Sequence, residues 1–236
     1  MYHSIIISDR NTWDYWHLIP SSRPLVNPPE AKIQIIEVPG STDSFVDMTD
    51  LLTGSVMYGS RQGSWPFIVH PDWCDKPSWT VRYQDIMQYL HGKTHKVILE
   101  DDPYYYYEGR LKLNQWQTGA NWSTIAIDYV FKPYKKSIHE TRVVLSGEAV
   151  DDPPTYYTIN KTVKLTVGDE AVTPVFTLDN SNGETIVTFN DQTYTLAEGE
   201  NKFKQIKLTR SNNEITVNST VMGAINVTVS YRNGWL

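Results

Sequence analysis

The chain has 236 residues, of which 40% are hydrophobic, so it is long enough to bury the core of one large domain or of two small ones. Its formal net charge of -6 is evenly spread: residues 1–135 carry 12 basic and 15 acidic side chains, and residues 136–236 carry 9 and 12. This distribution excludes a basic half for binding nucleic acid and a polybasic run for a membrane surface. We expect no signal peptide, because the apolar run at the N-terminus is too short, and no transmembrane segment.

The two halves of the chain differ in composition and in sequence pattern. Seven of the eight tryptophans precede residue 123, whereas the second half is rich in Thr, Val, Asn and Lys with regular alternation. Consecutive prolines after two acids, in Asp151-Asp-Pro-Pro154, are typical of a stiff connector. We therefore predict an N-terminal domain over residues 1–136, a linker over 137–151 and a C-terminal domain over 152–236.

Strands dominate the predicted N-terminal domain. Pro66 demotes part of its strand to a sheet edge or a bulge, because proline has no N–H for the ladder. The last two strands are joined by the loop 117–121 and are expected to form a hairpin. The strands are expected at residues 31–38, 56–58, 63–69, 97–100, 105–116 and 122–131.

One segment of this half has helical periodicity. Its apolar residues fall on a single stripe at a period of 3.6, which predicts a helix near residues 79–91. Ser78 is placed to cap its first amides, and Gly92 supplies a left-handed stop. The prediction is a β-sandwich-type domain with one packed α-helix. The stripe consists of Trp79, Tyr83, Ile86, Met87 and Leu90.

The second half is predicted to be an antiparallel β-sandwich of about 85 residues, since short strands alternate with turn signals. Asn182-Gly183 is the strongest turn signal, because both residues tolerate the positive φ of a tight hairpin. The strands are expected at residues 158–167, 172–178, 185–190, 192–196, 202–208, 214–218 and 224–231.

Histidines and the single cysteine are the first candidates for chemistry. His91 and His95, with the acids 100–102, have residue types that hold zinc, but Gly92 ends the helix between them, so the two rings would not share a helical face. Cys74 with His70 or His91 as base lacks a recognisable nucleophile motif. A lone cysteine excludes an intramolecular disulfide and fits folding in a reducing cytoplasm. We interpret these residues as structural.

Acidic and aromatic clusters give further candidates. Paired carboxylates could serve a glycosidase, although acids before a proline are typical of a solvated turn. The run Asp179–Gly183 is faintly like a calcium loop, but its fifth position is glycine and no helix pair flanks it, which indicates a hairpin turn. The aromatic tract Tyr104–Tyr107 could stack on sugars; alternation puts half of it in the core and the rest on a surface or subunit interface. The acids considered are Glu100, Asp101, Asp102, Glu108 and Asp128.

These patterns predict a two-domain β protein that is not an enzyme, with no catalytic, cofactor-binding or metal-binding residues. There is no phosphate loop and no dinucleotide motif. Two other readings stay open. One is a carbohydrate-binding module that recognises a host cell-wall polysaccharide. The other is a cell-wall hydrolase that uses Glu100 or Asp102.

Five segments, in sequence order, resemble the distal tail proteins (Dit family) of siphophages and prophages, which belong to the baseplate hub. The departures are Tyr15, where the family pattern has an acid, and a longer tyrosine tract. The resemblance covers about the first 135 residues. The segments are Asn11–Pro24, Leu51–Gly54 with Tyr58-Gly59, Tyr89–Lys93, Leu99–Arg110 and Ile127–Tyr134.

The resemblance implies a fold and a role. Distal tail proteins form a hexameric ring whose N-terminal domains line a channel. The ring joins the tail tube protein to the tail-associated fibre or lysin, and receptor-binding proteins can attach around it. We therefore expect a homohexamer at the virion tail tip, assembled in the bacterial host cytoplasm, with no cofactor, no nucleic-acid-binding motif and no membrane contact.

Two regions receive specific expectations within this frame. The C-terminal domain of similar proteins is galectin-like, but the only tryptophan here is Trp235, so we read this domain as a docking module and not as a lectin. The proline-rich segment Leu18–Pro29 is long and irregular, which makes it a candidate arm for the ring contact.

Overall fold

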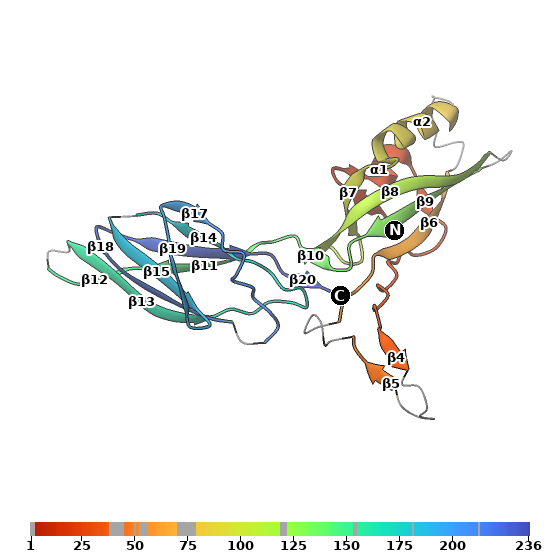
Figure 1. Cartoon of the computed structure of the whole chain (residues 1–236). Helices are drawn as coiled ribbons and strands as arrows, with labels where there is room; N and C mark the ends of the chain where they lie inside the picture. Colours follow the sequence, from red (N-terminus) through yellow and green to blue (C-terminus); the bar gives the residue numbers. More distant parts are fainter. Residues whose placement is uncertain are drawn as a thin grey trace. The chain divides into compact units, whose positions relative to one another are not determined.

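The structure is a computed structural model that describes residues 3–37, 45–49, 51, 56–69, 79–118, 122–152, 155–180, 182–211 and 213–236. The chain divides after Lys135 into two compact units, with Leu236 counted in the first (Figure 1). Most regular structure is strand, and the mainly β fold predicted from the sequence is confirmed.

The first unit is built on one antiparallel sheet with the strand order β2-β1-β7-β8-β9-β6-β3. Two helices, α1 (Thr12–Trp16) and α2 (Trp79–Leu90), cover one face of it (Figure 1). The other face carries both polar and apolar side chains. The strands are β1 (Ile5–Ile7), β2 (Arg10–Asn11), β3 (Ile19–Pro20), β6 (Arg61–Val69), β7 (Thr94–Leu99), β8 (Tyr105–Thr118) and β9 (Ser123–Phe131).

Alternation along β9 explains how the sheet separates its two faces. Ile125, Ile127 and Tyr129 are almost completely buried, while Asp128 and Val130 point away from the core. Each fully buried large apolar side chain contributes about 1.5–3 kcal/mol relative to an exposed one. A one-residue slip of register would reverse every one of these positions, so the buried face fixes the pairing.

Pro66 lies in β6 at the position where the sheet can accept it. Its carbonyl accepts a hydrogen bond from Ser21 N–H on the outer side, where β3 provides only two residues of pairing. Because the N and O of one strand residue face the same side, the missing N–H of Pro66 also faces this edge. The pairing of β6 with β9 runs without a bulge from Arg61 to Val69, and β6 lies between β9 and the short edge strand β3, so β6 itself is not an edge strand.

Helix α2 follows the predicted boundaries. Ile86 and Leu90 are completely buried, and Gly92 has the expected positive φ of 73°. The prediction that Met87 faces the core is wrong, because its side chain is 39% exposed, and Tyr89 packs against the core instead. The predicted cap Ser78 lies outside the described residues.

An arm, described over residues 30–37, 45–49, 51 and 56–59, projects from the first unit (Figure 1). Its base is closed by Gly59 N–H bonding to Glu30 O at 2.8 Å and by Lys32 N–H bonding to Met57 O at 2.8 Å. The described parts include the hairpin of β4 (Ile35–Glu37) and β5 (Phe45–Asp47). The predicted strand 31–38 is therefore shorter within the described residues, and the predicted strand 56–58 is reduced to a bridge at Tyr58.

The candidate arm Leu18–Pro29 lies along the sheet instead of projecting from it, and its expected part in a ring contact stays a prediction. Leu18 is completely buried, and Val26 packs against the core. Trp65 Nε1 donates to Leu25 O at 2.8 Å, and Asn27 N–H donates to Tyr129 Oη at 3.0 Å. The prolines stiffen this stretch, but its hydrogen bonds tie it to the sheet.

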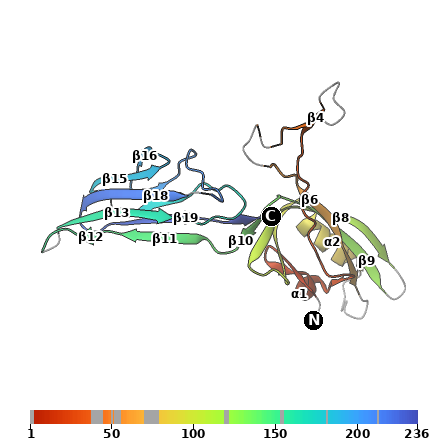
Figure 2. The ribbon, with the colours of Figure 1, turned by 90° about the horizontal axis from the view of Figure 1, so that it is seen from below.

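The second unit is an antiparallel β-sandwich (Figure 2). Its sheets have the orders β11-β19-β14-β17 and β12-β13-β18-β15-β16, and both supply residues to one core. The short strands β10 (Lys135–Ser137) and β20 (Gly234–Trp235) pair with each other. The others are β11 (Thr141–Ser146), β12 (Glu148–Ala149), β13 (Tyr156–Lys164), β14 (Val175–Leu178), β15 (Gly183–Phe189), β16 (Gln192–Thr195), β17 (Gly199–Asn201), β18 (Glu214–Met222) and β19 (Asn226–Tyr231).

The interval 137–151, expected to be a linker, contains β11 and β12. Val143 and Leu145 of β11 pack into the core, and the whole strand pairs with β19. Asp151 follows β12 and accepts hydrogen bonds from the N–H groups of Thr155 and Tyr156, so it forms part of the turn into β13. Pro153 and Pro154 lie outside the described residues.

Two local predictions in this unit are wrong. Residues 202–208 do not form a strand, because Phe203 and Ile206 both turn inward around a tight turn, closed by Ile206 N–H donating to Phe203 O. Asn182-Gly183 does not form the tight hairpin, since Gly183 already belongs to β15. The residues with positive φ are Asn190 (49°) and Asp191 (61°), between β15 and β16.

Candidate functional site

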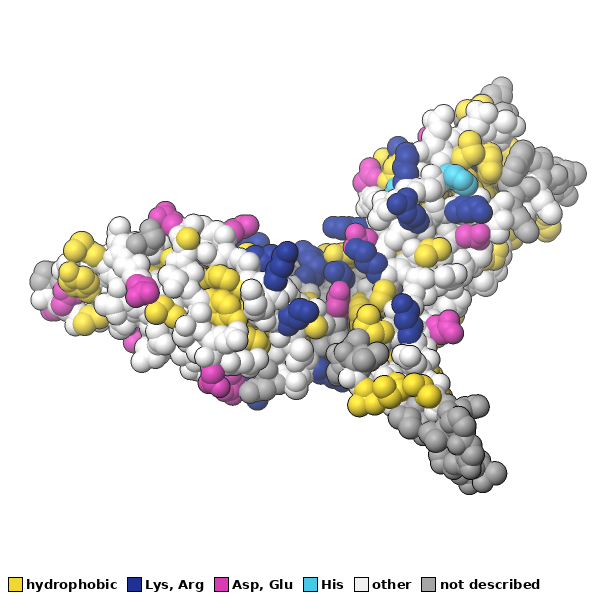
Figure 3. All heavy atoms as spheres, viewed as in Figure 1, with side chains coloured by type: hydrophobic (Ala, Val, Ile, Leu, Met, Phe, Trp, Pro, Cys, Tyr) yellow, Lys and Arg dark blue, Asp and Glu magenta, His cyan; other side chains and the backbone are white. Residues whose placement is uncertain are grey.

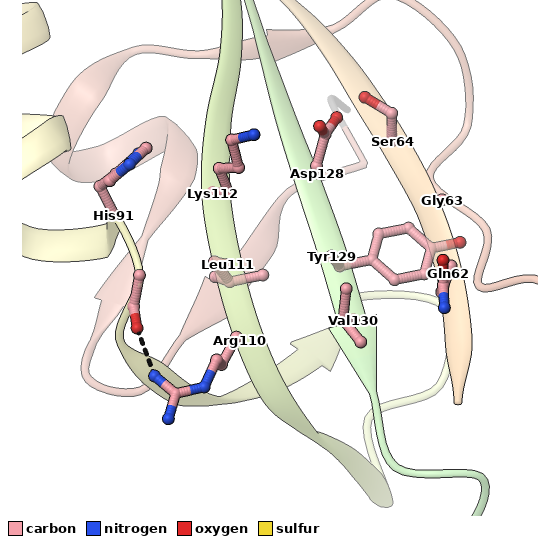
Figure 4. Close-up of a pocket in the computed structure, with 11 residues that line it drawn as sticks. Gln62, Gly63, Ser64, His91, Arg110, Leu111, Lys112, Asp128, Tyr129 and Val130 are labelled. Atoms are coloured by element: carbon pink, nitrogen blue, oxygen red, sulfur yellow. Dashed lines mark hydrogen bonds between the residues drawn. The ribbon is translucent and has the colours of Figure 1, made fainter. Parts of the chain in front are cut away.

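The outer face of the first unit's sheet holds a cavity of about 660 Å³ (Figure 4). Strands β6, β8 and β9 form its floor, and the residues after α2 form one wall. The volume falls within the range of small-molecule sites. Its polar side chains are Gln62, Ser64, His91, Arg110, Lys112 and Asp128.

Strand register brings these side chains together. Asp128 of β9 lies opposite Lys112 of β8 and opposite Ser64 of β6, and Figure 4 shows it between them. One step along, Val130 lies opposite Arg110 and Gln62. Since every second residue of a strand shares a face, both rows point away from the core.

One side of the cavity is cationic. Arg110 Nη1 donates to Gly92 O at 2.7 Å, which fixes the guanidinium against the end of α2 (Figure 4). The positive φ of Gly92 turns the chain at this point. Lys112 lies beside Arg110 on the same face and forms no ion pair among the residues that the structure describes. Figure 3 shows Lys, Arg and His side chains gathered over this part of the sheet.

His91 adds a hydrogen-bond donor to this wall. Its Nδ1 accepts from Leu113 N–H at 3.3 Å, so in the neutral ring the proton is on Nε2. The side chain is exposed at the edge of the cavity. An imidazole and two cations therefore line one side.

The other side of the cavity offers hydroxyl, amide and carboxylate groups. Ser64 and Gln62 are exposed, and Gln62 Nε2 donates to Ser60 Oγ at 2.9 Å. Asp128 Oδ1 is shielded from solvent and has no hydrogen-bond partner within the described part of the chain. An acceptor that is shielded from solvent and has no partner is costly.

The histidine pair considered from the sequence does not converge. His95 is buried in a different place, where its Nδ1 lies 3.1 Å from Ser8 Oγ and its Nε2 lies 3.1 Å from Tyr89 O. Burial lowers the pKa of His95, and the positive charge of Lys93 acts in the same direction. The Tyr89 carbonyl and Asp9 partly oppose the shift. Both ring nitrogens of His95 thus serve the fold.

The acidic candidates are dispersed over separate partners. Glu100 accepts from Ser4 N–H at 2.7 Å, and Asp101 pairs with Arg23 at 2.7 Å. Lys135 pairs with Asp102 at 2.7 Å.

Glu108 pairs with Lys132 and lies on the cavity's face of the sheet, four residues along the ladder from Asp128. That corresponds to roughly 13 Å, wider than the separation of a glycosidase pair. Glu108 and Asp128 therefore do not form such a pair.

The remaining candidates are accounted for locally. Asp179 accepts from Asn226 N–H and from its side-chain amide, so the calcium-like run closes a turn. Tyr107 is a core residue, whereas Tyr104 is 70% exposed. Cys74 and His70 lie outside the described residues. Within the described ranges, no cluster of three His, Cys, Asp or Glu side chains is arranged to hold a metal ion, and no helix is long and apolar enough to span a membrane.

Sequence reasoning singled out His91 and Asp128 but missed their neighbours in the cavity. Alternation along a strand places Gln62 and Ser64 on one face, and likewise Arg110 and Lys112, so the sequence alone could have indicated these two pairs. The register that puts Ser64, Lys112 and Asp128 in one row comes from the folded sheet.

The arm presents a second candidate surface. Ile33, Ile35 and Ile36 are 65%, 53% and 49% exposed, and Leu51 and Met57 are also exposed. Figure 3 shows hydrophobic side chains on the arm. Apolar side chains concentrated on a projecting hairpin mark an interaction surface.

The sequence matches no protein-family model and no curated protein. Among solved structures, the chain is similar to the Dit protein of phage SPP1, described as a paradigm of the hub adsorption apparatus in phages that infect Gram-positive bacteria. The two share 11% sequence identity, with a TM-score of 0.60, and the match covers 98% of this chain and 99% of that one.

The chain has the Dit fold. The expectation drawn from the segments between residues 11 and 134 is thereby confirmed at the level of fold. The Dit likeness extends through the second unit as well, where no segment of the sequence resembled the family.

Proposed function

We propose that this protein is a structural subunit of a phage tail tip, assembled as a hexameric ring at the baseplate hub. The observation that carries the proposal is the Dit fold over nearly the whole chain. The ring would join the tail tube protein to the tail-associated fibre or lysin and to the host-adsorption apparatus, with receptor-binding proteins as further partners. In this role the protein is not an enzyme.

The arm supports assembly from several copies. Its exposed isoleucines are uncovered in a single chain, and covering each would contribute up to about 1.5–3 kcal/mol. A ring with cyclic symmetry uses two different surfaces of each subunit, which meet head to tail. A projecting arm and the neighbour's body fit that requirement. Each contact needs on the order of 1,000 Å² to be stable.

Replacing Ile33→Asp tests the arm as the ring contact. Ile33 is 65% exposed and lies outside the regular strands, so the substitution leaves the single chain folded. We expect weaker self-association in sedimentation velocity, because a carboxylate would be buried at the interface. Val150→Asp is the matched control, since Val150 is 61% exposed in the second unit and also lies outside the strands. Equal effects of the two substitutions would contradict an arm-mediated contact.

A further inference from the structure

We propose that the cavity on the first unit's sheet binds a phosphate diester of a polyol or sugar. The two sides of the cavity carry the two kinds of group that such a ligand needs. This inference does not rest on the ring, because all the residues involved belong to one copy of the first unit.

The phosphate would occupy the cationic side. Lys112 and Arg110 are neighbours on one face of β8, and His91 Nε2 supplies a third donor. Arg110 is already held by Gly92 O, so less side-chain entropy is lost on binding. Arginine and lysine together are the usual partners of phosphate oxygens.

The polyol hydroxyls would face Asp128. A hydroxyl donates to a carboxylate, and the carboxylate of Asp128 lines the cavity between Lys112 and Ser64. Ser64 lies opposite Asp128 in the register and can donate or accept. A simple anion would be repelled by Asp128, so this residue selects a ligand that carries hydroxyls close to its phosphate.

Direct binding to the full chain tests the proposal. The probes are a glycerol phosphate oligomer, an oligo-dT of equal charge that lacks free hydroxyls between its phosphates, and poly-L-glutamate. We expect the glycerol phosphate oligomer to bind more tightly than the other two in calorimetry at matched ionic strength. Equal binding of all three would show attraction by charge alone and overturn the proposal, and a preference for poly-L-glutamate would assign the cavity to an acidic protein segment.

Two substitutions make the test specific to the cavity. Lys112→Gln should weaken binding of the glycerol phosphate oligomer at least about fivefold. Lys132→Gln is the matched control, because it removes the same charge from the same face of the sheet outside the cavity. Equal losses in the two variants would overturn the proposal.

Asp128→Asn separates hydroxyl recognition from charge. Removing a negative charge strengthens the binding of a plain anion, whereas losing the carboxylate acceptor weakens a hydroxyl-bearing one. We expect weaker binding, and tighter binding would overturn the proposal. If this variant does not fold, Ser64→Ala provides the same comparison at an exposed position.

Glycerol phosphate occurs in cell-wall polymers and in lipid headgroups, and a second binding measurement distinguishes the two. Vesicles of phosphatidylglycerol are compared with the soluble oligomer, and Lys112→Gln is measured against both. Loss of oligomer binding alone assigns a wall-type polymer, and loss of vesicle binding alone assigns a lipid. If Lys112→Gln changed the binding of neither the oligomer nor the vesicles, the cavity would not be the site.

Discussion

At the residue scale, Gly63 shows how closely the sheet packs against the segment before the arm. A Cβ at this position would overlap Tyr129 Oη, which accepts the N–H of Asn27 at 3.0 Å. Gly63→Ala must displace Tyr129 or residue 27, so we expect a loss of about 1–3 kcal/mol in the free energy of unfolding. Gly59→Ala is the control, since its nearest neighbour is Glu30 O at 3.5 Å. Chemical denaturation of both variants checks this, and a loss in Gly59→Ala as large as in Gly63→Ala would contradict the packing argument.

His95 should make the stability of the first unit depend on pH. Burial lowers its pKa in the folded state, so below the ordinary value of 6.5 the unfolded chain binds the proton more readily than the folded one. The free energy of unfolding should therefore fall as the pH decreases from about 6.5 toward the lowered pKa, and this contribution should be constant above.

Denaturation curves between pH 5 and 8 measure this dependence. His95→Gln should flatten it, because the buried group with the lowered pKa is then absent. A slope that persists in His95→Gln would assign the effect to another group.

At the scale of elements, the arm can be removed without opening the sheet. Lys32 N and Met57 O are 2.8 Å apart, so a short glycine linker can replace residues 33–56 and keep the aromatic contact of Tyr58 with Tyr134. We expect an unchanged melting temperature, because the arm's exposed isoleucines stabilise nothing in the single chain. We also expect self-association to be lost. Light scattering tests both, and a shortened chain that still assembles would refute the arm's role.

Sequence patterns predicted best the elements whose buried face repeats at a regular period. The stripe containing Ile86 and Leu90 gave α2, and strict alternation gave β9, because burial leaves a period in the sequence. No described side chain of the arm is buried, so the pattern predicted a strand at 31–38 but not that this segment projects from the sheet. The prolines of residues 18–29 led to the prediction of an arm there, whereas in the structure this segment packs along the sheet.

Long-range pairing explains the other misses. Strand β11 is stable because it pairs along its length with β19, some eighty residues later, and its own turn signals are weak. The cavity has the same origin, since Ser64, Lys112 and Asp128 meet only through the register of three strands. A single sequence carries the residue types of such a site but not their juxtaposition.

At the scale of the whole molecule, the chain combines a Dit fold, a projecting apolar arm and a polar cavity on the sheet. The central claim is that several copies assemble into a ring. Native mass spectrometry of the purified full-length protein tests it most directly. A hexameric ring predicts a closed species with six times the mass of one chain, and a chain that remains monomeric at every concentration would contradict it.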